Sequence, residues 1–190
     1  MFKNLKSKYI LQILFNNLLK KKSLEIIRYN NNIKNRLNIS IKDYIDCLSI
    51  EIEIKPVNNK YGKFINIDKG DEKYYHIYLN DEKEEIKRNY INEDENIEKI
   101  KIIIGYQIKS FKGLFQDCEY IEYIYFKKFY RNNINNMGDM FSECSSLKEL
   151  NLSNFNTNNV TNMRWMLSGC SEQLKNKIKS EYKNIKKEAF

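Results

Sequence analysis

The side chains in this chain with the greatest capacity for chemistry are four cysteines and one histidine. Cys47, Cys118, Cys144 and Cys170 form no CxxC pair, and His76 is the only histidine in the sequence. Zinc sites and disulfide frameworks use cysteines at short, paired spacings, usually with several histidines for zinc. The spacing here predicts no metal site, no disulfide framework and no cofactor.

The last three cysteines recur at an interval of 26 residues. Stacked strands would place such residues ~4.8 Å apart with parallel Cβ directions, whereas a disulfide needs convergent Cβ atoms at about 3.5–4.5 Å. We therefore expect buried free thiols that pack as small hydrophobic side chains. His76 lies in the strand-like stretch "YYHIYLN", and spacing pairs it with no nucleophile or carboxylate. We expect a strand residue and a non-enzymatic protein.

The composition is that of a globular chain able to bury a core. Its 190 residues are 42% hydrophobic, 13% aromatic and 31% charged. Lysine, isoleucine and asparagine number 28, 27 and 27, and all three use A/T-rich codons, which indicates an A/T-rich genome. Some of the lysine excess is then tolerated on a solvated surface.

The net charge of +8 belongs to the N-terminal third. Residues 1–64 hold 13 Lys or Arg against 5 Asp or Glu, and residues 65–190 hold 20 of each. Only five of the cationic residues are arginine, the residue that nucleic-acid binders favour for bidentate and stacking contacts. A basic nucleic-acid-binding protein is therefore a minor alternative, and no small-molecule substrate is expected.

No stretch approaches the ~20 apolar residues that span a bilayer, so we expect no transmembrane segment. The apolar N-terminal run is interrupted by Gln12, Asn16 and Asn17, and Lys20–Lys22 follow where a small-residue cleavage site would stand. This pattern favours an amphipathic helix over a signal peptide. It also favours an intracellular location, with the cell surface as the alternative.

Four regions follow from changes in hydrophobic period. Residues 1–48 show helical spacing, and residues 49–96 predict a small antiparallel meander and linker. The meander's strands are "SIEIEIK", "KFINID" and "YYHIYLN", of which the first has one wet face. Residues 97–170 contain repeats, and residues 171–190 predict a capping helix that begins at Ser171.

The repeat has a period of 26 residues. Phe115, Phe141 and Leu167 share this interval, as do the three cysteines and three further apolar sets. Each set is preceded by a hexamer of L-x-x-L-x-L type: "IEKIKI", "IEYIYF" or "LKELNL". We expect the hexamers to form a parallel sheet and the following residues a helical or 3₁₀ return, with asparagine amides bonding the adjoining coil.

The stretch "MFSECSSLKELNLSNFNTNNVTNMRWMLSGCS" resembles the BspA-like leucine-rich repeat family. Units of that family read MF-x-x-C-x-x-L-x-x-L-x-L-x-x-F-x-T-x-x-V-x-x-M, and the resemblance extends over residues 97–170. It implies a solenoid used for protein–protein binding or adhesion, often at a microbial cell surface. Together with the pattern, it predicts an α+β fold: N-terminal helices and a small β meander, then a short leucine-rich-repeat solenoid with a C-terminal helical cap.

The predicted function is non-enzymatic protein binding through the exposed strand positions of the repeats, because solenoids bind through such extended faces and Tyr is favoured at hot spots. The candidate residues are Glu98, Lys99, Lys101, Glu122, Tyr123, Tyr125, Lys148, Glu149 and Asn151.

An alternative comes from the N-terminal helices. Residues 6–37 are similar in pattern to an F-box, with apolar matches at Ile10, Leu11, Leu14, Phe15 and Leu18 but no leading Leu-Pro. This resemblance implies an intracellular substrate adaptor of a ubiquitin ligase, in which the repeats select substrates. A surface adhesin is a further alternative.

Overall fold

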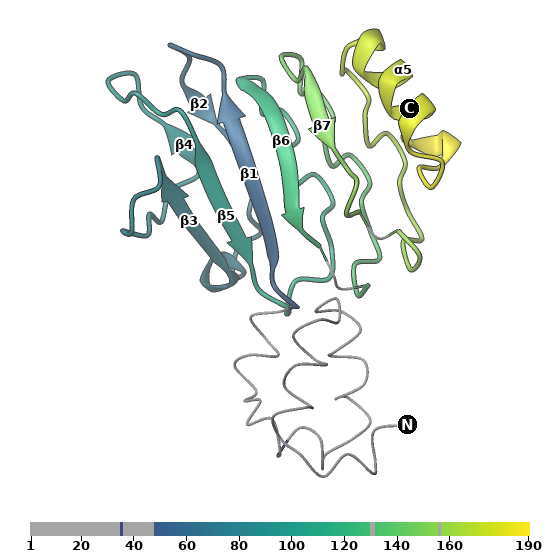
Figure 1. The fold of residues 1–190 in the computed structure, drawn as a ribbon, viewed down its shortest axis with the longest axis horizontal. Helices are drawn as coiled ribbons and strands as arrows, with labels where there is room; N and C mark the ends of the chain where they lie inside the picture. The colour runs from purple at the N-terminus through teal and green to yellow at the C-terminus, as the bar shows by residue number, and fades with distance from the viewer. Residues whose placement is uncertain (1–34, 36–47, 130–131, 156) are drawn as a thin grey trace, which may run out of the picture. The chain divides into compact units, whose positions relative to one another are not determined.

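The structure, a computed structural model, describes residues 35, 48–129, 132–155 and 157–190 (Figure 1). The chain divides into two compact units, residues 1–48 and 49–190, and every described strand belongs to the second. Apart from residues 35 and 48, the predicted N-terminal helices lie outside the described residues. The F-box-like positions and Cys47 lie outside them as well.

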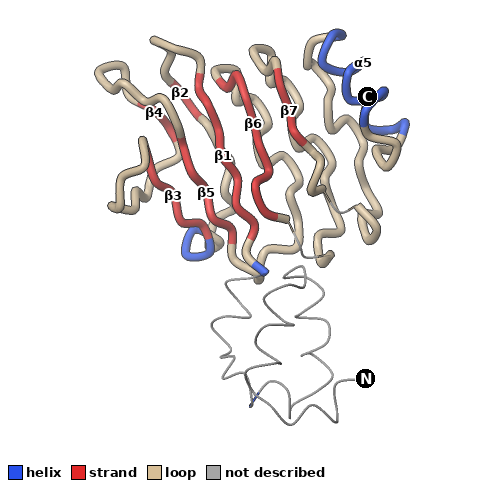
Figure 2. Tube along the Cα trace, in the orientation of Figure 1, coloured by secondary structure: helices blue, strands red, loops and turns tan. Residues whose placement is uncertain are grey.

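The described residues form two sheets, of five strands and two strands, and one α-helix (Figure 2). The larger sheet has the strand order β3-β5-β1-β6-β7, and β2 pairs with β4. The strands are β1 (Ile50–Pro56), β2 (Gly62–Lys63), β3 (Tyr75–Leu79), β4 (Tyr90–Ile91), β5 (Ile100–Ile104), β6 (Ile121–Lys128) and β7 (Glu149–Asn151).

Strand β1 lies in the middle of the larger sheet and runs antiparallel to both neighbours. Ile52 pairs with Ile102 of β5 on one side and with Phe126 of β6 on the other. The alternation of "SIEIEIK" explains this position, because Ile50, Ile52 and Ile54 are fully buried on one face. Only β6 and β7 pair in parallel within this sheet, with Ile124 opposite Leu150.

The predicted fold class is therefore wrong. The second unit consists mostly of strands in one mixed sheet, and neither a separate meander nor a stack of three parallel hexamers forms among its described residues. Because β1 occupies the place between β5 and β6, the hexamers "IEKIKI" and "IEYIYF" do not pair with each other. Two of the expected meander's strands, β1 and β3, join the larger sheet instead: β1 pairs with β5 and β6, and β3 pairs with β5.

The segment "KFINID" is mostly not a strand. Only Lys63 pairs within β2, and Phe64 and Ile65 turn into the core. Asn66 explains the departure, since its side-chain amide donates to the carbonyl oxygens of Gly113 and Gln116, both at 2.8 Å. The segment is thereby held on the turns that follow β5.

Residues 108–118, 134–144 and 160–170 form what we call the turn layer. They are turns, not the expected helical or 3₁₀ returns. The N–H of Leu114 donates to Phe111 within its own segment at 3.2 Å, whereas the N–H of Phe115 donates to Met140 in the next segment at 2.8 Å. Since donors alternate between local and cross-segment acceptors, an uninterrupted helix cannot form.

The 26-residue repeat itself is confirmed in this layer. Met137 and Phe141 donate to Asn162 and Met166 of the third segment, as Phe111 and Phe115 donate to the second. The predicted asparagine ladder is also present: the side-chain amides of Asn133, Asn159 and Asn184 each donate to a backbone carbonyl 27 or 29 residues earlier.

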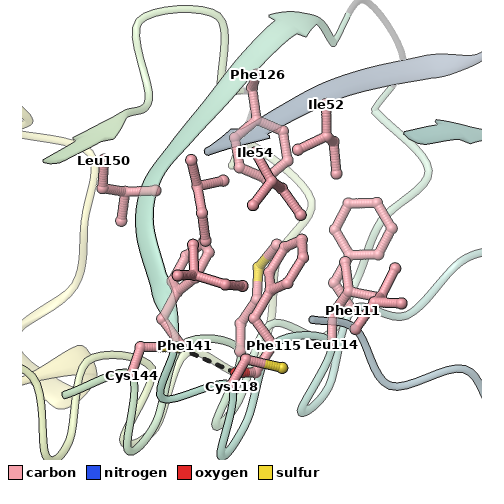
Figure 3. Packing of buried hydrophobic residues seen from close by; sticks show 14 of the residues in the cluster. Ile52, Ile54, Phe111, Leu114, Phe115, Cys118, Phe126, Phe141, Cys144 and Leu150 are labelled. Atoms are coloured by element: carbon pink, nitrogen blue, oxygen red, sulfur yellow. Dashed lines mark hydrogen bonds between the residues drawn. The ribbon is translucent and has the colours of Figure 1, made fainter. Parts of the chain in front are cut away.

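The core lies between the larger sheet and the turn layer (Figure 3). Ile52, Ile54 and Phe126 extend from the strands toward side chains of the turn layer, among them Phe115 and Phe141. Burying each such side chain contributes about 1.5–3 kcal/mol. The repeat therefore supplies buried side chains to both the larger sheet and the turn layer, and these two layers share one core.

Helix α5 (Glu172–Glu181) lies beyond β7 (Figure 2). Ser171 is its N-cap as predicted, accepting the N–H of Leu174 at 3.3 Å. Leu174 and Ile178 form its buried stripe. The helix has ten residues, so it is shorter than predicted.

Candidate functional site

The outward face of the larger sheet brings together most of the predicted binding residues. Because side chains alternate along a strand, residues opposite each other in register share a face. Asn151 lies opposite Tyr125, Tyr125 opposite Glu53, and Glu53 opposite Lys101. Tyr78 of β3 completes a row that crosses all five strands.

A second row lies beside the first. Tyr123 is opposite Lys55 in β1 and Glu149 in β7. The Lys55 ammonium lies 5.2 Å from the centre of the Tyr123 ring. Tyr123 of β6 therefore lies between a cation on β1 and a carboxylate on β7.

Glu122 connects cations from two elements. Its carboxylate lies 2.7 Å from the ammonium of Lys148 and 3.9 Å from that of Lys55. The hydrogen bond and the charge of Glu122 together raise the pKa of Lys148. Lys148, a predicted binding residue, lies at this corner of the sheet, just before β7.

Lys99 lies at the other side of the sheet, just before β5. Its ammonium is bonded to the carboxylate of Asp81, which raises the pKa of Lys99. Glu98, its neighbour, donates its backbone N–H to the side-chain oxygen of Asn80 at 2.8 Å. Both residues therefore contact the turn after β3 and lie away from the rows that contain Tyr123 and Tyr125.

Three residues central to this face were not among the candidates. Glu53 and Lys55 lie on β1, and Lys127 lies at the end of β6. The Lys127 ammonium is 4.2 Å from the centre of the Tyr125 ring and 3.6 Å from Glu53. Alternation identified the wet side of β1, but no signal in the sequence places β1 beside β6.

We call the outward-facing set the strand face. Its side chains are half-exposed or exposed. Lys101 and Lys127 pair with carboxylates of the neighbouring strand β1, whereas Glu149 lies 3.7 Å from Lys177 of α5. The strand face comprises Glu53, Lys55, Tyr78, Lys101, Tyr123, Tyr125, Lys127, Glu149 and Asn151.

The cysteines of the repeat are confirmed as buried free thiols. Cys144 donates its S–H to the carbonyl of Phe115 at 3.0 Å, and Cys170 donates to the carbonyl of Phe141 in the same way. Burial raises the pKa of Cys118 to about 12 and that of Cys170 to about 11. These thiols are therefore protonated, and weak nucleophiles, at neutral pH.

His76 is a strand residue, as predicted, in β3. The structure adds a carboxylate that spacing did not reveal, because Glu85 lies 3.1 Å from its Nδ1 atom. Lys87 contacts the same carboxylate, and the bond from Lys87 is the main cause that lowers the pKa of Glu85. His76 and Glu85 are both half-buried, and the pair lies at the edge of the larger sheet formed by β3.

Metal-binding clusters and membrane-spanning helices are absent from the described residues. No group of three or more His, Cys, Asp or Glu there could hold a metal ion. Likewise, no helix of the described part is long and apolar enough to cross a membrane.

Residues 87–188 match a family model whose description reads "Mycoplasma protein of unknown function, DUF285". The chain belongs to the DUF285 family. No curated protein and no solved structure matches it. The DUF285 segment contains β4 to β7 and α5, hence every predicted binding residue, whereas β1 and β3 precede it. The strand face is thus built from the DUF285 segment together with two strands outside it.

Proposed function

We propose that this DUF285 protein is a non-enzymatic protein-binding module and that the strand face is its contact surface. The observation that carries the proposal is the row formed by Tyr78, Lys101, Glu53, Tyr125 and Asn151 across all five strands. A surface that presents three tyrosines and charged groups of both signs has the composition of a protein interface. The leucine-rich repeat resemblance, which points to the same kind of function, stays a prediction.

The two central tyrosines are the expected anchors. Tyr125 and Tyr123 are half-buried and held by cations at 4.2 and 5.2 Å from their ring centres. A ring already fixed in the free protein loses less entropy on binding. Interface tyrosines are frequent hot spots, and truncating one commonly costs about 2 kcal/mol or more of binding free energy.

The charges of the face can serve specificity at little expense to the fold. The pairs Lys101–Glu51 and Lys127–Glu53 have nitrogen–oxygen distances of 3.3 and 3.6 Å and are a third or more exposed. Exposed pairs of this kind contribute about 0.2–1 kcal/mol to stability. They can therefore exchange partners when a protein with complementary charges docks.

The dimensions of the face indicate a modest interface. Five strands spaced ~4.8 Å apart and about six residues long cover roughly 20 Å by 20 Å. This is about half of the ~800 Å² that each partner contributes to a standard interface. We therefore expect either a transient complex or a partner that also contacts the loops beside β7.

Affinity capture with matched variants tests the proposal. The intact protein and the Tyr123→Ser/Tyr125→Ser double variant are used as baits under equal loading. The control is Tyr61→Ser/Tyr90→Ser, which removes two exposed tyrosines near β2 and β4. Proteins retained by the wild type and the control but lost from the double variant support the strand face. An unchanged set of retained proteins contradicts it.

A further inference from the structure

The turn layer has an edge at its third segment, residues 160–170. Asn162 of this segment forms a parallel bridge with Asn136 of the second segment. Among the described residues, no fourth segment of the repeat follows on the other side. A backbone edge whose N–H and C=O groups lack partners is a template for pairing with another chain.

Residues 185–190, which we call the closing segment, cover this edge. The N–H of Met163 donates to the carboxylate of Glu188 at 3.1 Å, and the N–H of Leu167 donates to the main-chain carbonyl of Ala189 at 2.7 Å. Elsewhere in the layer, the equivalent N–H groups donate to main-chain carbonyls of the following segment. The closing segment therefore takes the place of a fourth segment.

Carbonyl groups on the same edge meet a charged side chain as well. The ammonium of Lys186 donates to the carbonyl oxygens of Val160 and Thr161, at 2.9 and 3.3 Å. Since Glu188 accepts the N–H of Met163, a donor and two acceptors of the edge are bound by charged side chains. Charged residues, and lysine above all, are what proteins place at sheet edges to prevent pairing with another chain.

Two apolar side chains fix the closing segment to the core. Ile185 and Ala189 are 9% and 0% exposed and belong to the same buried cluster as Val160 and Met163. Burying a charge at such a position is strongly unfavourable. Charged substitutions at both positions are therefore expected to release the segment from the edge.

The edge beneath the closing segment is complementary to itself. The Thr161 carbonyl is an acceptor and the Met163 N–H is a donor, and both face the closing segment. When two such edges meet antiparallel about a two-fold axis, the N–H of each chain can reach the carbonyl of the other. The partner that this edge fits is a second copy of the chain.

We propose that the closing segment is an autoinhibitory contact, which prevents two copies of this chain from pairing through residues 161–163. Lys186 and Glu188 occupy the groups that a second copy would bind, and Ile185 and Ala189 hold them there. Displacement of the segment allows a two-fold dimer to form. This contact belongs to the turn layer, so it does not depend on the strand face.

Sedimentation of full-length variants tests the proposal. Ile185→Asp/Ala189→Asp displaces the closing segment and is expected to produce a species of twice the wild-type mass. The control is Lys183→Asp/Lys187→Asp, at two exposed positions, and it should sediment like wild type. Circular dichroism checks that each variant keeps its strands.

A second variant keeps the test decisive if the displaced one unfolds. Lys186→Ser/Glu188→Ser retains both apolar contacts, and we expect it to shift toward the same dimer as its concentration rises. If the variants that fold sediment like wild type, the proposal is overturned.

Thr161→Lys distinguishes edge pairing from nonspecific association. Added to either dimerising variant, it brings two lysines together across the two-fold axis and should weaken the dimer about tenfold or more. A free peptide of residues 182–190 should likewise dissociate the dimer by covering the edge. Association that neither Thr161→Lys nor the peptide reduces would overturn the proposal, as would a control variant that dimerises.

Discussion

The rings of Phe115 and Phe141 are stacked nearly parallel, with centroids 5.7 Å apart and planes inclined by 5°. The two residues are 26 positions apart, and the N–H groups of both donate to the following segment of the turn layer. Phe126 of β6 meets Phe141 edge-on from the sheet, at 6.5 Å. The repeat and the sheet are thus joined through one aromatic cluster, which fixes the strand face on a rigid support.

Replacing Phe141 with alanine should strongly destabilise the unit. Its side chain is fully buried and contacts rings from both layers, so we expect a loss of about 3–5 kcal/mol of unfolding free energy. Urea denaturation followed by circular dichroism measures this. Tyr90→Ala, at a tyrosine that is 49% exposed, is the control and should change stability by less than about 1 kcal/mol. Similar losses for both would show that Phe141 does not belong to the core.

The buried thiols predict a specific pH dependence. Burial raises the pKa of Cys118 from 9.0 to about 12, so the folded state keeps a proton that the unfolded chain releases above pH 9. Stability from this group is complete below pH 9 and declines as the pH rises from there toward 12. We expect the unfolding free energy of wild type to fall more steeply between pH 9 and about 10.5 than that of Cys118→Ala. Equal slopes would contradict a buried, protonated thiol.

The strand-face charges should matter for binding and not for folding. Glu53 is paired with exposed partners such as Lys127, so Glu53→Gln is expected to change the unfolding free energy by less than about 1 kcal/mol. Retention of the captured partner should nevertheless weaken. Glu84→Gln, at an exposed position after β3, serves as the control. If both variants retain the partner like wild type, Glu53 has no part in the contact.

Gly169 should resist substitution chiefly because of its backbone conformation, and to a smaller degree because of a contact with the flexible side chain of Glu143. Its φ is 72°, and a Cβ there would come within 2.4 Å of the Glu143 carboxyl group. We expect Gly169→Ala to lose about 1–2 kcal/mol. In the Gly169→Ala/Glu143→Ala double variant the backbone penalty remains and the contact penalty disappears. A double-mutant cycle by thermal unfolding measures the coupling; strict additivity would mean that the contact costs nothing.

The features that could be predicted from the sequence are those that the spacing of residues indicates directly. The 26-residue interval located the buried apolar ladder and the thiols, and alternation in "SIEIEIK" identified β1 and its wet side. The cap at Ser171 was also visible. Each of these signals depends on residues that are close in sequence or that repeat.

The features that were missed are set by contacts between distant segments. No residue type indicates that β1 inserts between β5 and β6, because its isoleucines would suit any buried face. Apolar residues at intervals of three and four suggested helical returns. The turn layer instead alternates local and cross-segment hydrogen bonds, and this alternation leaves no pattern in the sequence. The strand face was consequently predicted without four of its residues, which are Glu53, Lys55, Tyr78 and Lys127. Trp165 gave no sign of its left-handed backbone.

Site-specific photo-cross-linking is the sharpest test of partner binding through the strand face. A photoreactive phenylalanine analogue is placed at Tyr125 of the intact protein, and at Tyr90 in a matched control, before irradiation with a captured partner present. We expect a covalent adduct with that partner from position 125 and none from position 90. An adduct from position 90 alone, equal adducts from both, or none from either would contradict binding through the strand face.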